Sequence, residues 1–364
     1  MAEKNMECQI VTGGAGFIGS CYVLLARRRG VRVVTLDKLT YAGNLENLSS
    51  LAQDKEHIFV HGDIGNAELV AYLLETYRPD AIINFAAESH VDRSIVNPEA
   101  FVSSNVLGTA TLLRVVKDWW RGLVAERSAA FRFLHVSTDE VYGALQPGDP
   151  AFTETTPYSP NSPYSASKAA SDHLVRAFGE TFGLPVLLTN CSNNYGPRQF
   201  PEKLIPLMIC NALERNSLSI YGKGTNVRDW LHVEDHCAAI TRVLESGRPG
   251  QSYNIGGSSE RTNLEVVHEV CSILDELVPS DAGSYTDLIT FVTDRPGHDF
   301  RYAIDSAKIE AELDWKPQQD FTSGLRETVC WYLRNSSWVE NVRSGAYRDW
   351  MTANYGARNR ECSR

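Results

Sequence analysis

A glycine-rich turn directly follows the first apolar segment of the chain and restricts what this region can fold into. Residues 9–12 have the character of a short buried strand, and the sequence then continues as Gly-Gly-Ala-Gly-Phe-Ile-Gly over residues 13–19. A second apolar segment, residues 31–36, ends in Asp37. Glycines in such a turn allow a pyrophosphate to approach a helix N-terminus, and an acidic residue after the second strand hydrogen-bonds a ribose diol. Strand, glycine turn, helix, strand and acid in this order predict a dinucleotide-binding βαβ unit.

Asp37 also indicates which dinucleotide this unit binds. Its carboxylate would repel the 2′-phosphate of NADP, so the sequence favours NAD as the cofactor. The adjacent Lys38 weakens this preference without removing it, because its ammonium group could accommodate a phosphate.

The rest of the first half alternates apolar, strand-like segments with helical ones. The expected strands are residues 58–60, 81–85, 131–137 and 186–190, and the expected helices are residues 67–77, 98–120 and 164–182. Short apolar strands separated by helices indicate an α/β fold with a Rossmann-type doubly wound parallel sheet. Ligands of such sheets bind beyond the carboxyl ends of the strands, where many of the polar and small residues of this sequence fall.

The alternation of strand-like and helical segments weakens after residue 195. Turn-rich passages carrying cations replace the strand–helix alternation, among them Arg228 and residues 295–298. We expect residues 1–195 to form the NAD-binding domain. Two later segments, near residues 232–257 and 303–330, are expected to return to this domain. Residues 196–364 would mainly form a smaller C-terminal substrate-binding domain. Each arginine alone could simply be solvated or paired with a neighbouring aspartate, but Arg228 precedes an apolar strand and is expected to bind an anion.

Two groups of residues have the chemistry of an active site. Asp139 and Glu140 follow the predicted strand 131–137, and Tyr164 and Lys168 are four residues apart, on one face of a helix. A Lys ammonium group beside a phenol favours the phenolate and is expected to lower the pKa of Tyr164. The paired carboxylates supply a second acid and a second base. Either group alone is more often a solvated surface, but together with the glycine turn they predict an enzyme.

Composition excludes several other classes of protein. The formal net charge of −10 argues against non-specific nucleic-acid binding, and no stretch approaches the ~20 apolar residues that span a bilayer. The eight cysteines form no C-x-x-C pair and no metal-ligand spacing, so no metal site is expected. Scattered reduced thiols and an N-terminus without an apolar signal core predict a cytoplasmic protein.

These motifs together resemble the extended short-chain dehydrogenase/reductase family over nearly the whole chain, and within it the nucleotide-sugar 4,6-dehydratases. The Asp139–Glu140 pair distinguishes that group, because related 4-epimerases carry a Ser or Thr without it. The resemblance implies an NAD-dependent hydro-lyase that converts dTDP-glucose to dTDP-4-keto-6-deoxyglucose. It also implies a homodimer held by helices 98–120 and 164–182. A UDP-glucose dehydratase, a 4-epimerase and a non-catalytic NAD-binding regulator remain the alternatives.

The resemblance also assigns individual residues of this chain to three roles. The catalytic residues would be Thr138, Asp139, Glu140, Tyr164 and Lys168. The cofactor would be bound by Gly13, Gly16, Phe17, Ile18, Gly19, Asp37, Lys38, Leu39, Thr40, Asp63, Ile64, Ala86, Ala87, Ser89, Ser104, Tyr164, Lys168 and Asn194. The nucleotide sugar would be bound by His90, Thr138, Asp139, Glu140, Asn193, Lys203, Leu204, Ile205, Pro206, Tyr221, Arg228, Asn263 and His298. Asn263 could instead cap a helix that starts near Leu264.

Overall fold

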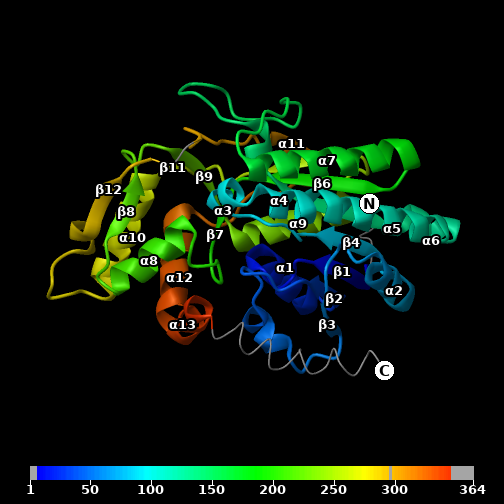
Figure 1. The fold of residues 1–364 in the computed structure, drawn as a ribbon, viewed down its shortest axis with the longest axis horizontal. Helices are drawn as coiled ribbons and strands as arrows, with labels where there is room; N and C mark the ends of the chain where they lie inside the picture. Colours follow the sequence, from blue (N-terminus) through cyan, green and yellow to red (C-terminus); the bar gives the residue numbers. More distant parts are fainter. Residues whose placement is uncertain (1–5, 295–296, 346–364) are drawn as a thin grey trace.

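A seven-stranded parallel sheet forms the centre of the first part of the chain (Figure 1). The computed structural model describes residues 6–294 and 297–345. The strands lie in the order β10-β6-β5-β4-β1-β2-β3, and each pairs in parallel with its neighbours. Their bounds are β1 (Cys8–Thr12), β2 (Arg32–Asp37), β3 (His57–His61), β4 (Ala81–Asn84), β5 (Arg132–Thr138), β6 (Val186–Cys191) and β10 (Ser252–Ile255). The predicted Rossmann-type doubly wound sheet is confirmed.

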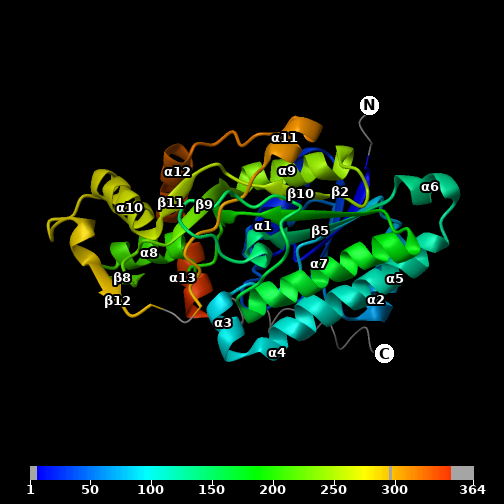
Figure 2. The same cartoon turned by 90° about the horizontal axis from the view of Figure 1, so that it is seen from above.

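Helices cover both faces of this sheet, because its strands are apolar on both sides (Figure 2). One face packs against α2 (Ala67–Tyr77), α5 (Thr109–Arg121) and α7 (Pro163–Phe182). The other face packs against α1 (Phe17–Arg28), α9 (Val233–Ser246) and α11 (Ala307–Leu313). The strand order reverses between β1 and β4, and a crevice at the carboxyl ends of these two strands is where such sheets bind ligands.

A second, smaller part lies beyond the carboxyl edge of the sheet (Figure 1). It contains a three-stranded sheet in the order β11-β9-β7 and a two-stranded sheet of β12 and β8. Its strands are β7 (Asn193–Tyr195), β8 (Leu218–Tyr221), β9 (Val227–His232), β11 (Glu260–Thr262) and β12 (Ile289–Val292). Its helices are α8 (Leu204–Leu213), α10 (Asn263–Leu277), α12 (Phe321–Arg334) and α13 (Ser336–Ser344). A separate apolar core joins these helices to β8 and β9.

The predicted helix at 98–120 is present but not uniform. It consists of α4 (Pro98–Phe101), a π-helical turn η2 (Val102–Gly108) and α5, without a break in the chain direction. The remaining short elements are α3 (Val91–Val96), α6 (Ala125–Ala130), η1 (Leu45–Leu51), η3 (Asp139–Tyr142) and η4 (Tyr285–Leu288). None of the helices within residues 6–294 and 297–345 is both long and apolar enough to cross a bilayer.

Candidate active site

The glycine turn forms a concave backbone surface, which side chains at the glycine positions would obstruct. Gly13 has φ +67°, and a Cβ there would lie 2.7 Å from the backbone nitrogen of Ala86. A Cβ on Gly19 would lie 2.2 Å from the carbonyl oxygen of Gly13. Only glycine therefore lets the end of β1, the start of α1 and the end of β4 approach this closely. The open backbone surface that results fits the pyrophosphate of a dinucleotide at the N-terminus of α1.

Asp37 ends β2 beside this turn, where a ribose would lie. Its carboxylate accepts hydrogen bonds from the backbone nitrogens of Ala15 (2.9 Å) and Leu39 (2.8 Å). Burial raises the pKa of Asp37, and these two donors counteract the rise. The ammonium group of Lys38 lies 2.7 Å from the carboxylate of Asp63. Lys38 is thus already engaged by a carboxylate, which reduces its ability to hold a 2′-phosphate.

One cavity runs along the carboxyl ends of β1, β2, β4, β5 and β6. Most of the residues assigned from the sequence line it: Gly13, Gly16, Phe17, Ile18, Gly19, Asp37, Lys38, Thr40, Asp63, Ile64, Ala86, Ala87, Ser89, Ser104, Thr138, Glu140, Tyr164, Lys168, Asn193, Asn194 and Lys203. The assigned residues outside its lining are Leu39, Asp139, His90, Leu204, Ile205, Pro206, Tyr221, Arg228, Asn263 and His298. The cavity lining therefore contains the cofactor set except Leu39 and the catalytic set except Asp139, and it leaves most of the substrate set outside.

The end of β5 positions the two carboxylates. Thr138 caps the short helix η3, because its hydroxyl accepts a hydrogen bond from the backbone nitrogen of Glu140 (3.3 Å). The chain turns at this cap, so the neighbouring side chains diverge. Glu140 lines the cavity, whereas Asp139 is only 1% exposed and accepts a hydrogen bond from the Thr138 hydroxyl (3.3 Å).

Burial raises the pKa of Asp139 well above its usual value, and the nearby charges of Glu140 and Asp229 raise it further. Its second oxygen, Oδ2, is buried and has no hydrogen-bond partner among the described residues. Both observations favour the protonated acid, because an ionised carboxylate is costly without donors. This difference from the more accessible Glu140 suits one residue as an acid and the other as a base.

Tyr164 and Lys168 lie on the first two turns of α7, which face the cavity. The helix begins with a capping box between Ser162 and Ser165, and Pro163 occupies its first position. The prediction that Tyr164 has a lowered pKa is wrong for the protein without bound cofactor or substrate. Burial raises the pKa of Tyr164 well above its usual value, and the charge of Glu140 adds to that rise. Burial and the charges of Glu140 and Asp139 therefore dominate the pKa of Tyr164.

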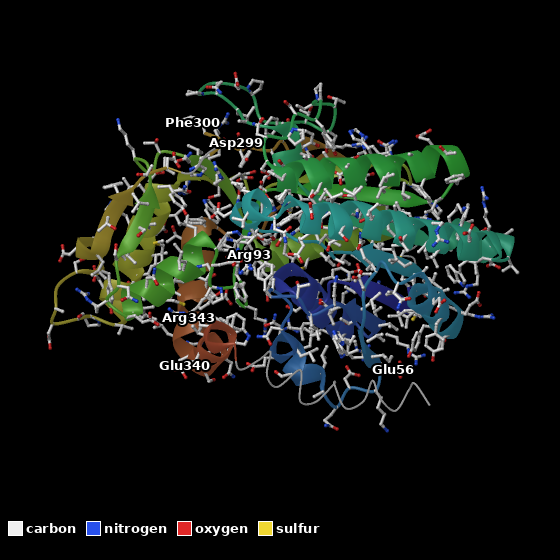
Figure 3. All side chains as sticks on the ribbon, in the orientation of Figure 1. Glu56, Arg93, Asp299, Phe300, Glu340 and Arg343 are labelled. Atoms are coloured by element: carbon white, nitrogen blue, oxygen red, sulfur yellow. The ribbon has the colours of Figure 1, made fainter. Side chains whose placement is uncertain are left out.

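Arg228 lies in β9 and is 6% exposed. Its guanidinium group donates to the carbonyl oxygens of Val227 (2.7 Å) and Asp299 (3.0 Å), and its Cζ lies 4.4 Å from the centre of the Tyr302 ring. The segment that carries Asp299 runs beside β9 (Figure 3). The alternative that Arg228 pairs with Asp229 is wrong, because the Asp229 carboxylate accepts instead from the backbone nitrogens of Gly257 and Ser259.

Other assigned residues surround this arginine or the mouth of the cavity. Asn263 is the first residue of α10, and its backbone nitrogen donates to the carbonyl of Asn226. The idea that Asn263 caps the helix is wrong, because Thr262 is the cap. His298 lies 2.6 Å from the Asp294 carboxylate, and its ring contacts that of Tyr221. Leu204, Ile205 and Pro206 form the first turn of α8, and His90 lies 3.9 Å from the Glu202 carboxylate.

Several cavity residues were not assigned from the sequence, although they lie next to residues that were. They include Tyr41, Glu88, Gln199, Phe200 and Glu202. Their closeness in the sequence to the assigned motif residues could have identified them as cavity residues. Tyr302 was also missed, because only the fold brings its ring beneath Arg228.

Comparisons with known proteins identify the family to which the chain belongs. A family model described as GDP-mannose 4,6 dehydratase matches residues 10–328. A dTDP-glucose 4,6-dehydratase from Xanthomonas campestris pv. campestris (strain B100) is 60% identical over 345 residues, which cover 94% of this chain and 98% of that protein. A dTDP-glucose 4,6-dehydratase from Streptomyces venezuelae, solved with NAD and TYD bound, has a TM-score of 0.83 at 47% identity, covering 92% of this chain and 99% of that chain.

The fold alone does not separate dehydratases from epimerases. A UDP-glucose 4-epimerase from Thermotoga maritima, solved with UDP-glucose, still has a TM-score of 0.80, covering 90% of this chain and 99% of that chain, but only 26% identity. Sequence identity separates the two: it is 47% to the dehydratase and 26% to the epimerase. The chain belongs to the dTDP-glucose 4,6-dehydratase family.

Proposed function

We propose that the protein dehydrates dTDP-glucose to dTDP-4-keto-6-deoxyglucose, as an NAD-dependent hydro-lyase. The observation that carries this proposal is the pair at the end of β5, in which buried Asp139 is held as an acid beside the cavity-lining Glu140. An oxidation or an epimerisation at C4 needs no such pair, whereas loss of water between C5 and C6 needs both a base and an acid. The 60% identity to a dTDP-glucose 4,6-dehydratase supports the same reaction.

The residues of the cavity fit NAD. The glycine turn offers an open backbone surface, Asp37 lies where a ribose diol would be, and Ala86 and Ala87 leave the end of β4 uncrowded. When bound, NAD would take up the hydride removed from sugar C4 and would return that hydride at C6. It is therefore not consumed, and we expect it to remain tightly held between turnovers.

The chain's own groups then move protons at stated atoms of the sugar. Tyr164 accepts the proton of the C4 hydroxyl as a phenolate, the form that the Lys168 ammonium group and the positive charge of a bound nicotinamide would favour over the phenol of the protein alone. Thr138 hydrogen-bonds the same oxygen. The C4 ketone that results acidifies the C5 proton, which Glu140 removes. Asp139 protonates the departing C6 hydroxyl, so water leaves. Reprotonation at C5 by the same pair completes the 4-keto-6-deoxy sugar.

The assay that tests this function uses the purified protein with dTDP-glucose and, separately, with UDP-glucose. Mass analysis of the product distinguishes loss of water from isomerisation and from no reaction. Loss of water from dTDP-glucose is the expected result. An isomer would favour the 4-epimerase, faster dehydration of UDP-glucose would favour the other nucleotide, and no turnover would favour a regulatory NAD-binding protein.

Arg228 is proposed to bind the substrate diphosphate, because a guanidinium group matches phosphate oxygens. Arg228→Ala is therefore expected to raise KM for dTDP-glucose about 10-fold or more with a smaller change in kcat, the loss of a charged hydrogen bond being worth about 1.5–3 kcal/mol. Steady-state kinetics check this. Arg248→Ala, at an exposed position after α9, serves as a control. An unchanged KM combined with a lower Tm would instead assign Arg228 a structural role at the Asp299 and Val227 carbonyls.

We also propose a cytoplasmic homodimer. Large apolar side chains are exposed along α3 to η2, namely Ile95 (46%), Val96 (86%), Val102 (49%) and Leu107 (60%). These lie near α5 and α7, the helices expected to pair between subunits. Sedimentation velocity at micromolar concentration should give a species of twice the chain mass of 40.5 kDa. A lone monomer would contradict the dimer.

Free thiols at all seven described cysteines suit a reducing compartment, which supports the proposed cytoplasmic location.

A further inference from the structure

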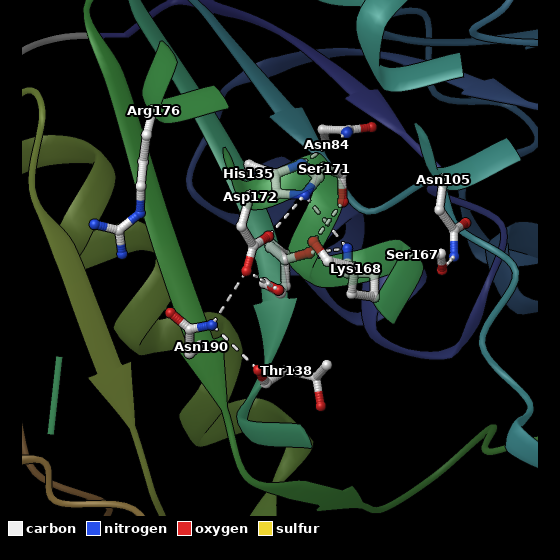
Figure 4. A network of polar contacts seen from close by, with 12 residues as sticks. Asn84, Asn105, His135, Thr138, Ser167, Lys168, Ser171, Asp172, Arg176 and Asn190 are labelled. Atoms are coloured by element: carbon white, nitrogen blue, oxygen red, sulfur yellow. Dashed lines mark hydrogen bonds and ion pairs between the residues drawn. The ribbon is translucent and has the colours of Figure 1, made fainter. Parts of the chain in front are cut away.

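A buried polar network adjoins Lys168 (Figure 4), and its members His135 and Asp172 do not line the cavity. Lys168, His135 and Asp172 are 4%, 1% and 0% exposed. The imidazole Nε2 of His135 lies 3.4 Å from the Lys168 ammonium and 3.4 Å from the Asp172 carboxylate. Tyr164, Lys168 and Asp172 are spaced by four residues on α7, so one face of the helix carries all three.

Hydrogen bonds on its other side fix the tautomer of His135. The Asn84 amide accepts from the Thr12 hydroxyl through its oxygen (2.5 Å), so its nitrogen donates to His135 Nδ1 (2.9 Å). Burial lowers the pKa of His135 to about 4, so the ring is neutral at working pH. With Nδ1 an acceptor, the single ring proton is on Nε2, the nitrogen that lies 3.4 Å from both Lys168 and Asp172.

The Lys168 ammonium group donates to the Val136 carbonyl (2.8 Å) and lies 3.4 Å from His135 Nε2. The other titratable groups that face Lys168 are Tyr164, on its own helix, and Cys191, from β6. Burial raises the pKa of both, so both are neutral. Asp172 is the remaining group of this set that can carry a negative charge.

The carboxyl group of Asp172 is hydrogen-bonded at one of its two oxygens. Its Oδ2 accepts from the hydroxyls of Ser137 (2.7 Å) and Tyr158 (3.0 Å) and from the amide of Asn190 (3.5 Å). Its other oxygen, Oδ1, lies 3.4 Å from His135 Nε2 and has no hydrogen-bond partner among the described residues. Arg176, one turn further along α7, lies against the Tyr158 ring and adds a positive charge on that side.

We propose that Asp172 is a positioning residue that keeps Lys168 an ammonium ion inside the buried site, with His135 as the neutral spacer between them. A lysine in an apolar site tends to lose its proton, and a nearby carboxylate opposes that loss. The inference rests on the proposed role of Lys168 beside Tyr164. The charge state of Lys168, which the inference concerns, can nevertheless be measured without an activity assay.

The first test is the pH dependence of kcat in Asp172→Asn, which keeps the shape and removes the charge. Burial lowers the pKa of Lys168 and Asp172 raises it, so without Asp172 the lysine should lose its proton at lower pH. The basic limb of the profile should therefore move down by about 1 pH unit or more, and activity should recover toward wild type at pH values below that limb. A loss of equal size at every pH would overturn the proposal, because a structural defect has that signature.

The second test observes Lys168 directly. The chain has only nine lysines, so a protein labelled with [ε-¹³C]lysine gives few resonances, and the one missing from Lys168→Met is assigned. The titration midpoint of that resonance should fall by about 1 pH unit or more in Asp172→Asn. An unchanged midpoint would refute the inference even if dehydration were confirmed. Conversely, a shifted midpoint would support it in a protein that proved inactive on dTDP-glucose.

Tyr158→Phe is the matched control, because it removes a hydrogen bond from Asp172 and leaves the charge in place. We expect its basic limb and its lysine midpoint to stay within a few tenths of a unit of wild type. Should Asp172→Asn fail to fold, Asp172→Ser removes the same charge and leaves a smaller side chain. A control that shifted as far as Asp172→Asn would show that hydrogen bonding, not charge, governs Lys168, and the proposal would be wrong.

Discussion

Glu140→Gln is expected to oxidise the sugar at C4 and then stop. The substitution keeps the size of the side chain and its place in the cavity but removes the base that takes the C5 proton. Tyr164 and Lys168 remain, so the first step can still occur. Loss of a positioned acid or base costs about 10²–10⁴-fold in rate, and overall turnover should fall by that order.

Two measurements separate this outcome from a general loss of activity. Mixing Glu140→Gln with dTDP-glucose should give absorbance at 340 nm from the reduced cofactor, and the recovered sugar should show little exchange at C5 in deuterated water. Glu126→Gln, an exposed position on α6, controls for the loss of one carboxylate. Dehydration by Glu140→Gln at the wild-type rate would make the Asp139–Glu140 pair structural and would favour the epimerase alternative.

Tyr164→Phe is expected to block the cycle one step earlier. Without the phenol oxygen no group is placed to take the proton of the C4 hydroxyl, so C4 oxidation should not begin. We expect no absorbance at 340 nm on mixing and a fall in turnover of about 10²–10⁴-fold. Tyr158→Phe makes the same chemical change at the segment before α7, outside the cavity lining, and should still form product.

The combination Tyr164→Phe with Glu140→Gln should behave as Tyr164→Phe alone, because the earlier block hides the later one. If the double variant instead gave absorbance at 340 nm, Tyr164 would not be the proton acceptor. The contrast between the two single variants thus tests whether the two groups act in separate steps.

Much of the sheet could be predicted from the sequence because its signals are local. The glycine turn, the apolar strand at 186–190 and the helix at 67–77 each follow from neighbouring residues, and the observed bounds differ by one or two positions at most. The π-helical turn at 102–108 could not be predicted, because its hydrogen bonding is set by packing against α7 rather than by residue type.

The electrostatics of the site could not be predicted from spacing. Tyr164 and Lys168 are four residues apart, which suggested a low pKa for the phenol. The actual direction depends on complete burial and on Glu140, which comes from a different segment. The surroundings of Arg228 depend likewise on carbonyl and ring contacts with residues about 70 positions later in the chain. Such long-range contacts leave no periodic pattern.

The edge position of β10 has a consequence for how the protein is made. This strand pairs only with β6, yet it lies more than 60 residues later in the chain than the end of β6. At about 5–20 residues per second, the ribosome needs roughly 3–12 s to add that length. Throughout this interval the nascent chain presents β6 as an unpaired, apolar strand edge, which is a site for aggregation. A fragment cut after residue 195 would retain that edge permanently, so we expect expression of the glycine-turn region alone to yield insoluble protein unless β10 and α9 are included.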